Sequence, residues 1–227
     1  LGGQQWIVKA QVHSGARGKA GGVKLVDRPE DVAMAAGSLL GQRLVTAQTG
    51  PTGLPVHSVL IEVPVTILRE LYVSLLIDRG RERIAVLASR AGGMEIEQLA
   101  ITQPELIYSE SIDNIVGLQG YQSRKIAFQL GLEGGQVGNF GKILAGLYRL
   151  AVERDISLLE VNPLVVPDND QLIALEAKGN VDDNALYRQP ALMEMRDASQ
   201  EEEKERTARE HGLNYITLDG DIACMVN

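Results

Sequence analysis

The chain of 227 residues has one cysteine, three histidines and no long apolar run. A single cysteine excludes a disulfide framework and fits a reducing compartment such as the cytoplasm. Cys224 lies in an apolar segment, so we expect a small core residue. No stretch reaches the roughly 18–20 apolar residues that a membrane-spanning helix needs. No histidine belongs to a legible serine–histidine–acid or cysteine–histidine set.

Positive charge is also scarce. Lysine and arginine number 22 against 30 acidic residues, which gives a formal net charge of −8. This balance argues against nucleic acid or an anionic membrane as the main partner, although it leaves room for a local site that binds a small anion. Hydrophobic residues make up 44% and charged residues 23% of the chain, as in ordinary folded proteins, and no internal repeat is visible.

Both ends of the chain are unusual for natural termini. The first residues, Leu1-Gly2-Gly3, contain neither a methionine nor a signal-peptide pattern, and the last residues, 223–227, are largely apolar. Natural termini are more often polar and frayed. We therefore expect the chain to be a piece of a longer protein.

Apolar periodicity predicts a mixture of strands and helices, and hence an α/β (α+β) fold. Residues 71–77 are apolar enough for a strand buried on both faces. Ser199 starts a capping-box match that opens the last helix, and a further strand is expected from Leu213. Strands are predicted at 6–13, 23–26, 58–65, 70–78, 83–89, 156–161 and 172–175, and helices at 27–40, 121–130, 137–152 and 199–209.

The most specific local feature is a cationic, glycine-rich segment near the start. A predicted strand carries Lys9, and the loop that follows, Ser14–Gly22, contains four glycines together with Arg17 and Lys19. Glycine lets the backbone approach an anion closely, and fixed cations add charge-assisted hydrogen bonds. The spacing matches neither the Walker motif nor the dinucleotide fingerprint. The segment favours phosphate binding, with a flexible hairpin of solvated charges as the alternative.

A second feature pairs an amide with a carboxylate. Asn162 directly follows one predicted strand, and Glu176, fourteen positions later, directly follows the next. Two strands joined by a polar turn would bring these side chains together, and their oxygens suit a hard cation such as Mg²⁺. The alternative is a surface carboxylate at a strand end.

Two further carboxylates, Glu62 and Glu70, lie close together in the sequence. Such carboxylates can accept hydrogen bonds from ribose hydroxyls, and the backbone beside Glu62 can pair with an adenine edge. The alternative is a solvated charge on an edge strand.

Taken together, these residues resemble the β subunit of succinate–CoA ligase, an ATP-grasp protein. The resemblance extends nearly from end to end, with the segments in the family's order. The matching segments are 8–13, 15–24, 44–46, 69–72, 92–97, 160–164, 183–188 and 213–220.

The resemblance implies an ATP-grasp nucleotide-binding domain at 1–206, without its N-terminal segment, and the start of a flavodoxin-like CoA-ligase domain at 207–227. It also implies a role for each matching residue. Phosphates are assigned to Lys9, Ala16, Arg17 and Gly18, the base to Glu62 and Val65, the ribose to Glu70, Mg²⁺ to Asn162 and Glu176, and the organic-acid side to Asn227.

Three departures from the family pattern stand out. Ala16 replaces a glycine of the loop, which the turn tolerates if φ is negative. Glu176 occupies a position that is commonly aspartate and must retract by one methylene. Arg90 and Ala91 replace a threonine and a glutamate.

The implied activity is reversible conversion of succinate, CoA and ATP or GTP into succinyl-CoA, nucleoside diphosphate and phosphate. The phosphorylated histidine would belong to an α subunit in an αβ or α2β2 assembly, and no nucleic acid or membrane is expected as a partner. Malate–CoA ligase is the closest rival. A nucleotide-binding or assembly module without turnover, and another ATP-grasp carboxylate ligase, are further alternatives.

Overall fold

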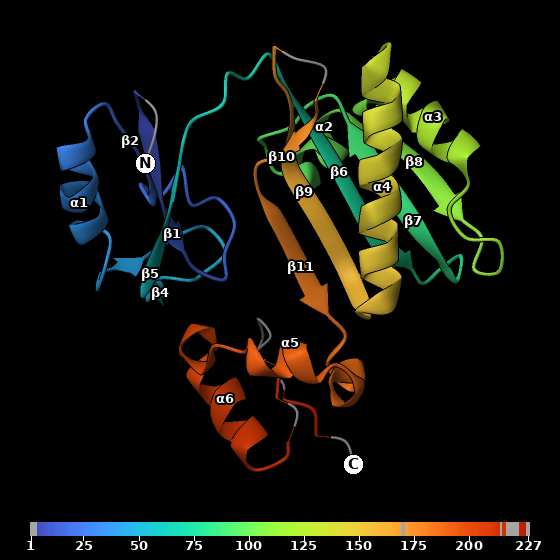
Figure 1. The fold of residues 1–227 in the computed structure, drawn as a ribbon. Coiled ribbons are helices and arrows are strands. Elements are labelled where there is room, and N and C mark those ends of the chain that lie inside the picture. The colour runs from blue at the N-terminus through green and yellow to red at the C-terminus, as the bar shows by residue number, and fades with distance from the viewer. Residues whose placement is uncertain (1–3, 169–170, 214, 217–222, 226–227) are drawn as a thin grey trace. The chain divides into compact units, whose positions relative to one another are not determined.

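The computed structural model describes residues 4–168, 171–213, 215–216 and 223–225. The chain divides into two compact units (Figure 1). The first unit consists of Leu1–Pro64 and Met195–Asn227, and the second of Val65–Glu194. Within the described ranges, no helix combines the length and the apolar character needed to cross a membrane.

The first unit is built on a three-stranded antiparallel sheet in the order β2–β1–β5. Its strands are β1 (Trp6–Gln11), β2 (Val23–Val26) and β5 (Ser58–Glu62). A small hairpin of β3 (Arg43–Leu44) and β4 (Leu54–Pro55), the 3-10 turn η3 (Ala198–Gln200) and the helix α6 (Glu203–Glu210) complete it.

One face of this sheet forms the core of the first unit with the helix α1 (Pro29–Gly37). Trp6, Val8 and Ala10 alternate along β1 and are at most 3% exposed, because a strand directs every second side chain to the same face. They pack in one cluster with apolar residues of α1. The same alternation places Lys9 on the opposite face of the sheet.

The second unit contains a six-stranded antiparallel sheet in the order β10–β9–β6–β7–β8, with β11 also paired to β9. The strands are β6 (Arg69–Asp78), β7 (Arg83–Ser89), β8 (Ile107–Ile112), β9 (Ile156–Val166), β10 (Ile173–Ala174) and β11 (Ala177–Val181).

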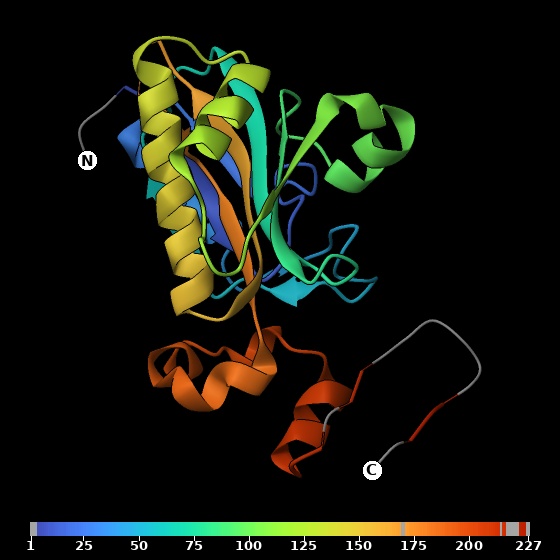
Figure 2. The same ribbon diagram turned by 90° about the vertical axis from the view of Figure 1, so that its right-hand side faces the viewer.

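Helices cover both faces of this sheet (Figure 2). The helices α3 (Gly120–Gln129) and α4 (Gly135–Glu153) lie on one face and supply most of the helical side of the core, including Phe140 and Leu144, which are fully buried. The shorter helix α2 (Ile96–Thr102) lies on the other face. The 3-10 helix η1 (Pro104–Leu106) lies between α2 and β8, and the unit ends with the 3-10 helix η2 (Asp183–Arg188) and the helix α5 (Pro190–Glu194).

The strands predicted at 23–26 and 83–89 are confirmed residue for residue. The predicted fully buried strand is confirmed for residues 71–75, whereas Ile77 is 49% exposed. The sequence did not predict α2, β8 or β11. Those elements are short or carry polar residues, so their apolar pattern is weak.

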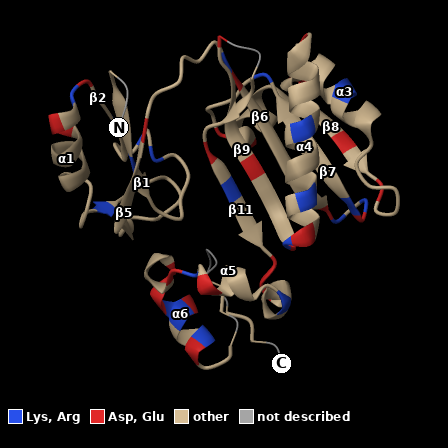
Figure 3. Ribbon diagram, in the orientation of Figure 1, with Lys and Arg blue, Asp and Glu red and all other residues tan. Residues whose placement is uncertain are grey.

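The predicted capping box at Ser199 is wrong. Ser199 lies inside η3, where Asp197 is the capping residue, and α6 begins only at Glu203. No residue of α6 is buried, and both signs of charge are interleaved along it (Figure 3), as is typical of a solvated helix.

The expected strands near the end of the chain are absent from the part that the structure describes. Neither Leu213 nor residues 215–216 and 223–225 form a strand, and Cys224 is exposed rather than buried. An apolar run becomes core only where another element covers it, and no described element covers this one.

A compact ionic contact joins two parts of the second unit. Asp155 follows α4 with a positive φ of 52°, and both of its carboxylate oxygens pair with the Arg188 guanidinium at the end of η2. The Gln189 amide donates a further hydrogen bond of 2.8 Å. The Arg188 hydrogen bonds, followed by that of Gln189, lower the pKa of Asp155 from its ordinary value of 3.8 to about 2.

Because its pKa is depressed by folding, ionised Asp155 stabilises the native state above about pH 4, and this stabilisation disappears as the pH falls through about 2. We predict that Asp155→Asn lowers the free energy of unfolding at pH 7 and flattens its decline between pH 4 and pH 2. Urea titrations at several pH values measure both effects. The exposed Asp168, changed to asparagine, is the control. If the free energy of unfolding declines equally steeply between pH 4 and pH 2 in wild type and in Asp155→Asn, the stabilising role of Asp155 is refuted.

Candidate functional site

One candidate site, in the first unit, lies on the face of the β1 sheet opposite the core. Lys9 and Glu62 lie on adjacent strands, offset by one diagonal step, since Lys9 pairs with Leu60 and Ile7 with Glu62. The Lys9 ammonium forms an ion pair with the Glu62 carboxylate, and their side chains are 12% and 33% exposed. Lys9, which the resemblance assigns to the phosphates, and Glu62, which it assigns to the base, therefore contact each other directly.

The glycine-rich loop at residues 14–22 is held at its start by side chains from another segment. The hydroxyl oxygens of Ser14 and Thr46 lie 2.6 Å apart, and the Gly15 N–H donates to the Gln48 side chain over 2.9 Å. At the far end, the Gly22 N–H donates to the Arg17 carbonyl over 2.8 Å. These contacts hold both ends of the loop.

The Arg17 side chain folds back onto the sheet. Its Nη1 donates to the Ala10 carbonyl over 2.7 Å, so at least one guanidinium donor is used to close the loop. Gly18 and Lys19 are exposed next to it. Arg17 therefore has a structural contact in addition to any role toward an anion.

Ala16 adopts a backbone conformation that favours glycine. Its φ is +58°, so the negative φ that would make alanine harmless at this position is not observed. A Cβ in the left-handed region approaches the following carbonyl and costs about 1–2 kcal/mol. The departure from the family's glycine is thus a source of strain at the start of the loop.

A second candidate site, in the second unit, centres on Asn162 in β9. Its Oδ1 accepts a 2.8 Å hydrogen bond from the Gly93 N–H, and its Nδ2 donates to the Met94 carbonyl over 2.9 Å. Nδ2 also lies 3.3 Å from a carboxylate oxygen of Glu160. The backbone N–H of Asn162 donates to the Glu176 carbonyl over 3.1 Å. The two residues are therefore neighbours through this backbone hydrogen bond, and their joint role toward a metal stays a prediction.

Two glycines permit the close approach of Glu70 to this cluster. A Cβ at Gly92 would lie 2.6 Å from the backbone nitrogen of Leu71, and a Cβ at Gly93 would collide with the Glu70 carboxylate. Gly93 also has a φ of +71°, which other residues rarely adopt. Glu70 therefore lies directly against the turn that binds the Asn162 amide.

The sequence did not single out Glu160. This half-buried carboxylate lies on the same face of β9 as Asn162, two positions away. Burial raises the pKa of Glu160, the carboxylates of Glu97 and Glu176 reinforce the shift, and the Asn162 amide and the Lys178 ammonium oppose it. The sequence does contain a signal for Glu160, because it is an ionisable residue inside an otherwise largely apolar predicted strand.

The donor set of this second site fits a hard cation. Within the described part of the chain, no three histidine, cysteine or acidic side chains gather closely enough to hold a metal by themselves. Mg²⁺, however, commonly takes one or two protein oxygens and completes its shell with phosphate and water. Asn162 Oδ1 retains a lone pair beyond its bond to Gly93, and Glu176 is the residue whose backbone carbonyl accepts from the Asn162 N–H.

The remaining predicted site residues are placed as follows. Val65 is half-buried and is the first residue of the second unit. Asn227, which the resemblance assigns to the organic-acid side, lies outside the described residues.

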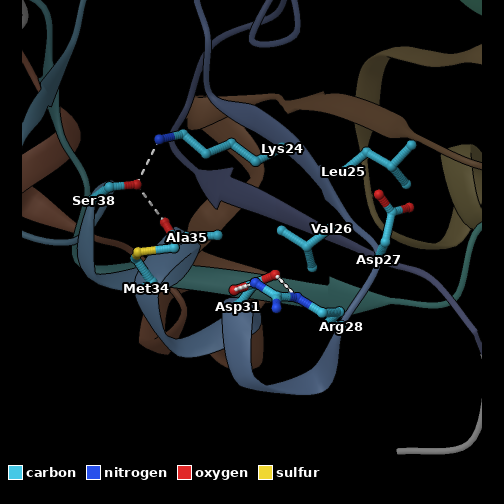
Figure 4. Close-up of a pocket in the computed structure, with 9 residues that line it drawn as sticks. All are labelled: Lys24, Leu25, Val26, Asp27, Arg28, Asp31, Met34, Ala35 and Ser38. Carbon is cyan, nitrogen blue, oxygen red and sulfur yellow. Dashed lines mark hydrogen bonds and ion pairs between the residues drawn. The ribbon is translucent and has the colours of Figure 1, made fainter.

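A separate hollow of about 630 Å³ lies between β2 and α1 and contains none of the predicted site residues (Figure 4). Its cations have partners within the hollow itself. The Lys24 ammonium donates to the Ser38 hydroxyl over 2.5 Å, and the Arg28 guanidinium binds both carboxylate oxygens of Asp31. The hollow is therefore not assigned to the candidate site.

A family model described as an ATP-grasp domain matches residues 1–166 of the chain. This chain belongs to the ATP-grasp family. Solved structures agree on the fold. ATP citrate lyase from Methanothrix soehngenii superposes with a TM-score of 0.66 at 18% identity, over 91% of this chain and 47% of that one. The predicted α/β ATP-grasp fold is confirmed.

Curated relatives match the ATP-grasp chain along its whole length. The β subunit of ADP-forming succinate–CoA ligase from Thioalkalivibrio sulfidiphilus is 57% identical over 227 residues, and that from Methylobacillus flagellatus is 56% identical over the same length. Each match covers 100% of this chain and 59% of the relative. The chain is thus a homologue of these β subunits and spans about three fifths of their length.

The strained loop residue gives a test within the first candidate site. We predict that Ala16→Gly stabilises the native state by about 1 kcal/mol, because glycine adopts a positive φ without the Cβ penalty. Chemical denaturation measures the change. Ala20→Gly, in the same loop but without a positive φ, is the matched control and should be neutral or destabilising. A loss of stability in Ala16→Gly would contradict the strain.

Proposed function

We propose that this chain is the nucleotide-binding part of an acid–CoA ligase β subunit that acts on succinate. The reaction would be reversible conversion of succinate, CoA and ATP or GTP into succinyl-CoA, nucleoside diphosphate and phosphate, as in the tricarboxylic acid cycle. The observation that carries the proposal is 57% identity along the whole chain to a succinate–CoA ligase β subunit. The relatives' names favour succinate over malate, and ADP-forming relatives favour ATP over GTP.

The proposed division of the chain follows the earlier prediction, with a nucleotide-binding domain at 1–206 and the start of a CoA-ligase domain at 207–227. An α subunit would contribute the histidine that accepts the phosphoryl group, in an αβ or α2β2 assembly. Asn227 would contribute to the organic-acid side. Since the chain covers 59% of its relatives, it would bind nucleotide without turning over substrates by itself.

In the first unit, Lys9 would bind the nucleotide phosphates. A largely buried ammonium requires an anion beside it, and Glu62 fills that place in this structure. Phosphate oxygens carry more negative charge than one carboxylate and would compete for the same ammonium. Loop residues Ala16, Arg17 and Gly18 would add donors around the phosphates, and Glu62, with the backbone near Val65, would bind the base.

In the second unit, Glu70 would accept hydrogen bonds from the ribose, while Asn162 and Glu176 would hold Mg²⁺. The Asn162 amide is oriented from three sides by Gly93, Met94 and Glu160, so its oxygen is fixed without the metal. When bound, Mg²⁺ would neutralise charge that develops on the phosphates during transfer. The longer Glu176 would reach the metal by adopting a retracted rotamer.

Lys9 provides the first test. In the full-length β subunit combined with its α subunit, Lys9→Ala should weaken Mg·ATP binding and slow histidine phosphorylation together, by roughly tenfold or more, because a charge-assisted contact is lost. Isothermal calorimetry and radiolabelled ATP measure the two effects. Lys24→Ala, which removes the same charge from a neighbouring strand, is the control. Unchanged phosphorylation would refute the role.

Loss of Lys9 also leaves Glu62 as a partly buried, unpaired carboxylate. The double variant Lys9→Ala/Glu62→Gln removes that charge. If the loss of phosphorylation reflects the missing ammonium, the double variant remains impaired. Recovery to the wild-type rate would show that the stranded carboxylate, rather than the missing ammonium, caused the defect.

Glu176 provides the second test. We predict that Glu176→Gln raises the Mg²⁺ concentration needed for half-maximal phosphorylation by about tenfold, as expected when one charged ligand is lost. Titration of the full-length α–β complex with Mg²⁺ at fixed ATP measures this shift. Glu105 is an exposed carboxylate in the same unit, and Glu105→Gln is the control. An unchanged Mg²⁺ requirement would remove Glu176 from the metal site.

A further inference from the structure

One buried glutamine connects the end of the first unit to the start of the glycine-rich loop. Gln200 lies in η3 and is 8% exposed. Its side-chain oxygen accepts a 3.2 Å hydrogen bond from the backbone N–H of His13, and its Nε2 donates to the Pro55 carbonyl over 2.8 Å. A single amide therefore joins three segments that are far apart in the sequence.

The position of His13 gives this contact its importance. Pairing of β1 ends at Lys9 on the β2 side and at Gln11 on the β5 side, so the sheet no longer supports the chain at His13. The glycine-rich loop begins one residue later. Three consecutive residues, His13, Ser14 and Gly15, are then held by side chains from elsewhere: those of Gln200, Thr46 and Gln48.

The turn that presents Gln200 is itself well fixed. The Asp197 carboxylate accepts hydrogen bonds from the Ser199 N–H over 3.0 Å and from its hydroxyl over 2.6 Å. Arg196 and Glu201 form a two-pronged ion pair across the same turn. Gln200 therefore occupies a preset position and does not have to be ordered when the loop binds a ligand.

We propose that Gln200 is a positioning residue for the glycine-rich loop and thereby sets the affinity for Mg·ATP. This inference rests on the proposed nucleotide-binding function. Gln200 does not contact the loop's tip. It fixes where the loop leaves β1, and small displacements of backbone donors weaken their contacts with an anion strongly. Gln200 lies beyond residues 1–166, so this support comes from outside the segment that the ATP-grasp model matches.

The test compares three variants of the full-length β subunit combined with its α subunit. Gln200→Met keeps the side-chain size but removes both hydrogen bonds, whereas Gln200→Glu keeps an acceptor for the His13 N–H. Gln189→Met is the matched control. Gln189 is 7% exposed and donates to the Glu153 carbonyl and the Asp155 carboxylate in the second unit, remote in sequence from the loop.

Two measurements are made on each variant: the dissociation constant for Mg·ATP, and hydrogen exchange of the backbone amides at residues 14–22. Gln200→Met should weaken Mg·ATP binding by about tenfold, the effect of one or two lost hydrogen bonds, and should accelerate exchange in the loop. Gln200→Glu should retain most of the slow exchange. Gln189→Met should leave both readouts unchanged, even where it lowers the melting temperature.

The possible failures are distinguishable. If wild type does not bind Mg·ATP, the proposed function fails. If wild type binds but Gln200→Met binds equally well with unchanged loop exchange, the positioning role is overturned while the proposed function stands. If Gln189→Met weakens binding as much as Gln200→Met, the effect is general destabilisation, and the positioning role is overturned.

Discussion

The ion pair between Lys9 and Glu62 is the contact on which the proposed phosphate binding by the first unit depends. A lysine ammonium with 12% of its side chain exposed needs an anion beside it, because an unpaired charge in that environment would be expensive. Here Glu62 supplies the anion from the neighbouring strand. The pairing holds the ammonium on one face of the sheet, so that an incoming phosphate group would compete with a single carboxylate. Nucleotide binding is then an exchange of partners for Lys9.

The second unit is organised around a neutral group, the Asn162 amide. An amide that uses both its oxygen and its nitrogen has little freedom to rotate, and this one connects β9 to the turn at Gly93 and Met94. The adjacent Glu160 gains a hydrogen bond from the same amide, although burial still raises its pKa. The geometry of the oxygen set therefore depends on a turn that only glycine can form, since a Cβ at Gly92 or Gly93 would collide with β6 or Glu70.

Much of this could be predicted from the sequence, and the omissions have physical causes. Strand-favouring residues predicted β2 and β7 residue for residue, and the spacing of Asn162 and Glu176 correctly predicted two adjacent strands. The contact of Lys9 with Glu62 could not be predicted, because it depends on a register between strands separated by some fifty residues. The positive φ of Ala16 and the reach of Gln200 to His13 are likewise tertiary properties with no local pattern.

The most direct test of the central claim is a crystal structure of the full-length β subunit, with its α subunit, bound to Mg²⁺ and a non-hydrolysable ATP analogue. The account predicts that the Lys9 ammonium binds a phosphate oxygen in place of Glu62, while Asn162 and Glu176 coordinate the metal on the same triphosphate. A nucleotide bound elsewhere, with Lys9 still paired to Glu62, would contradict it.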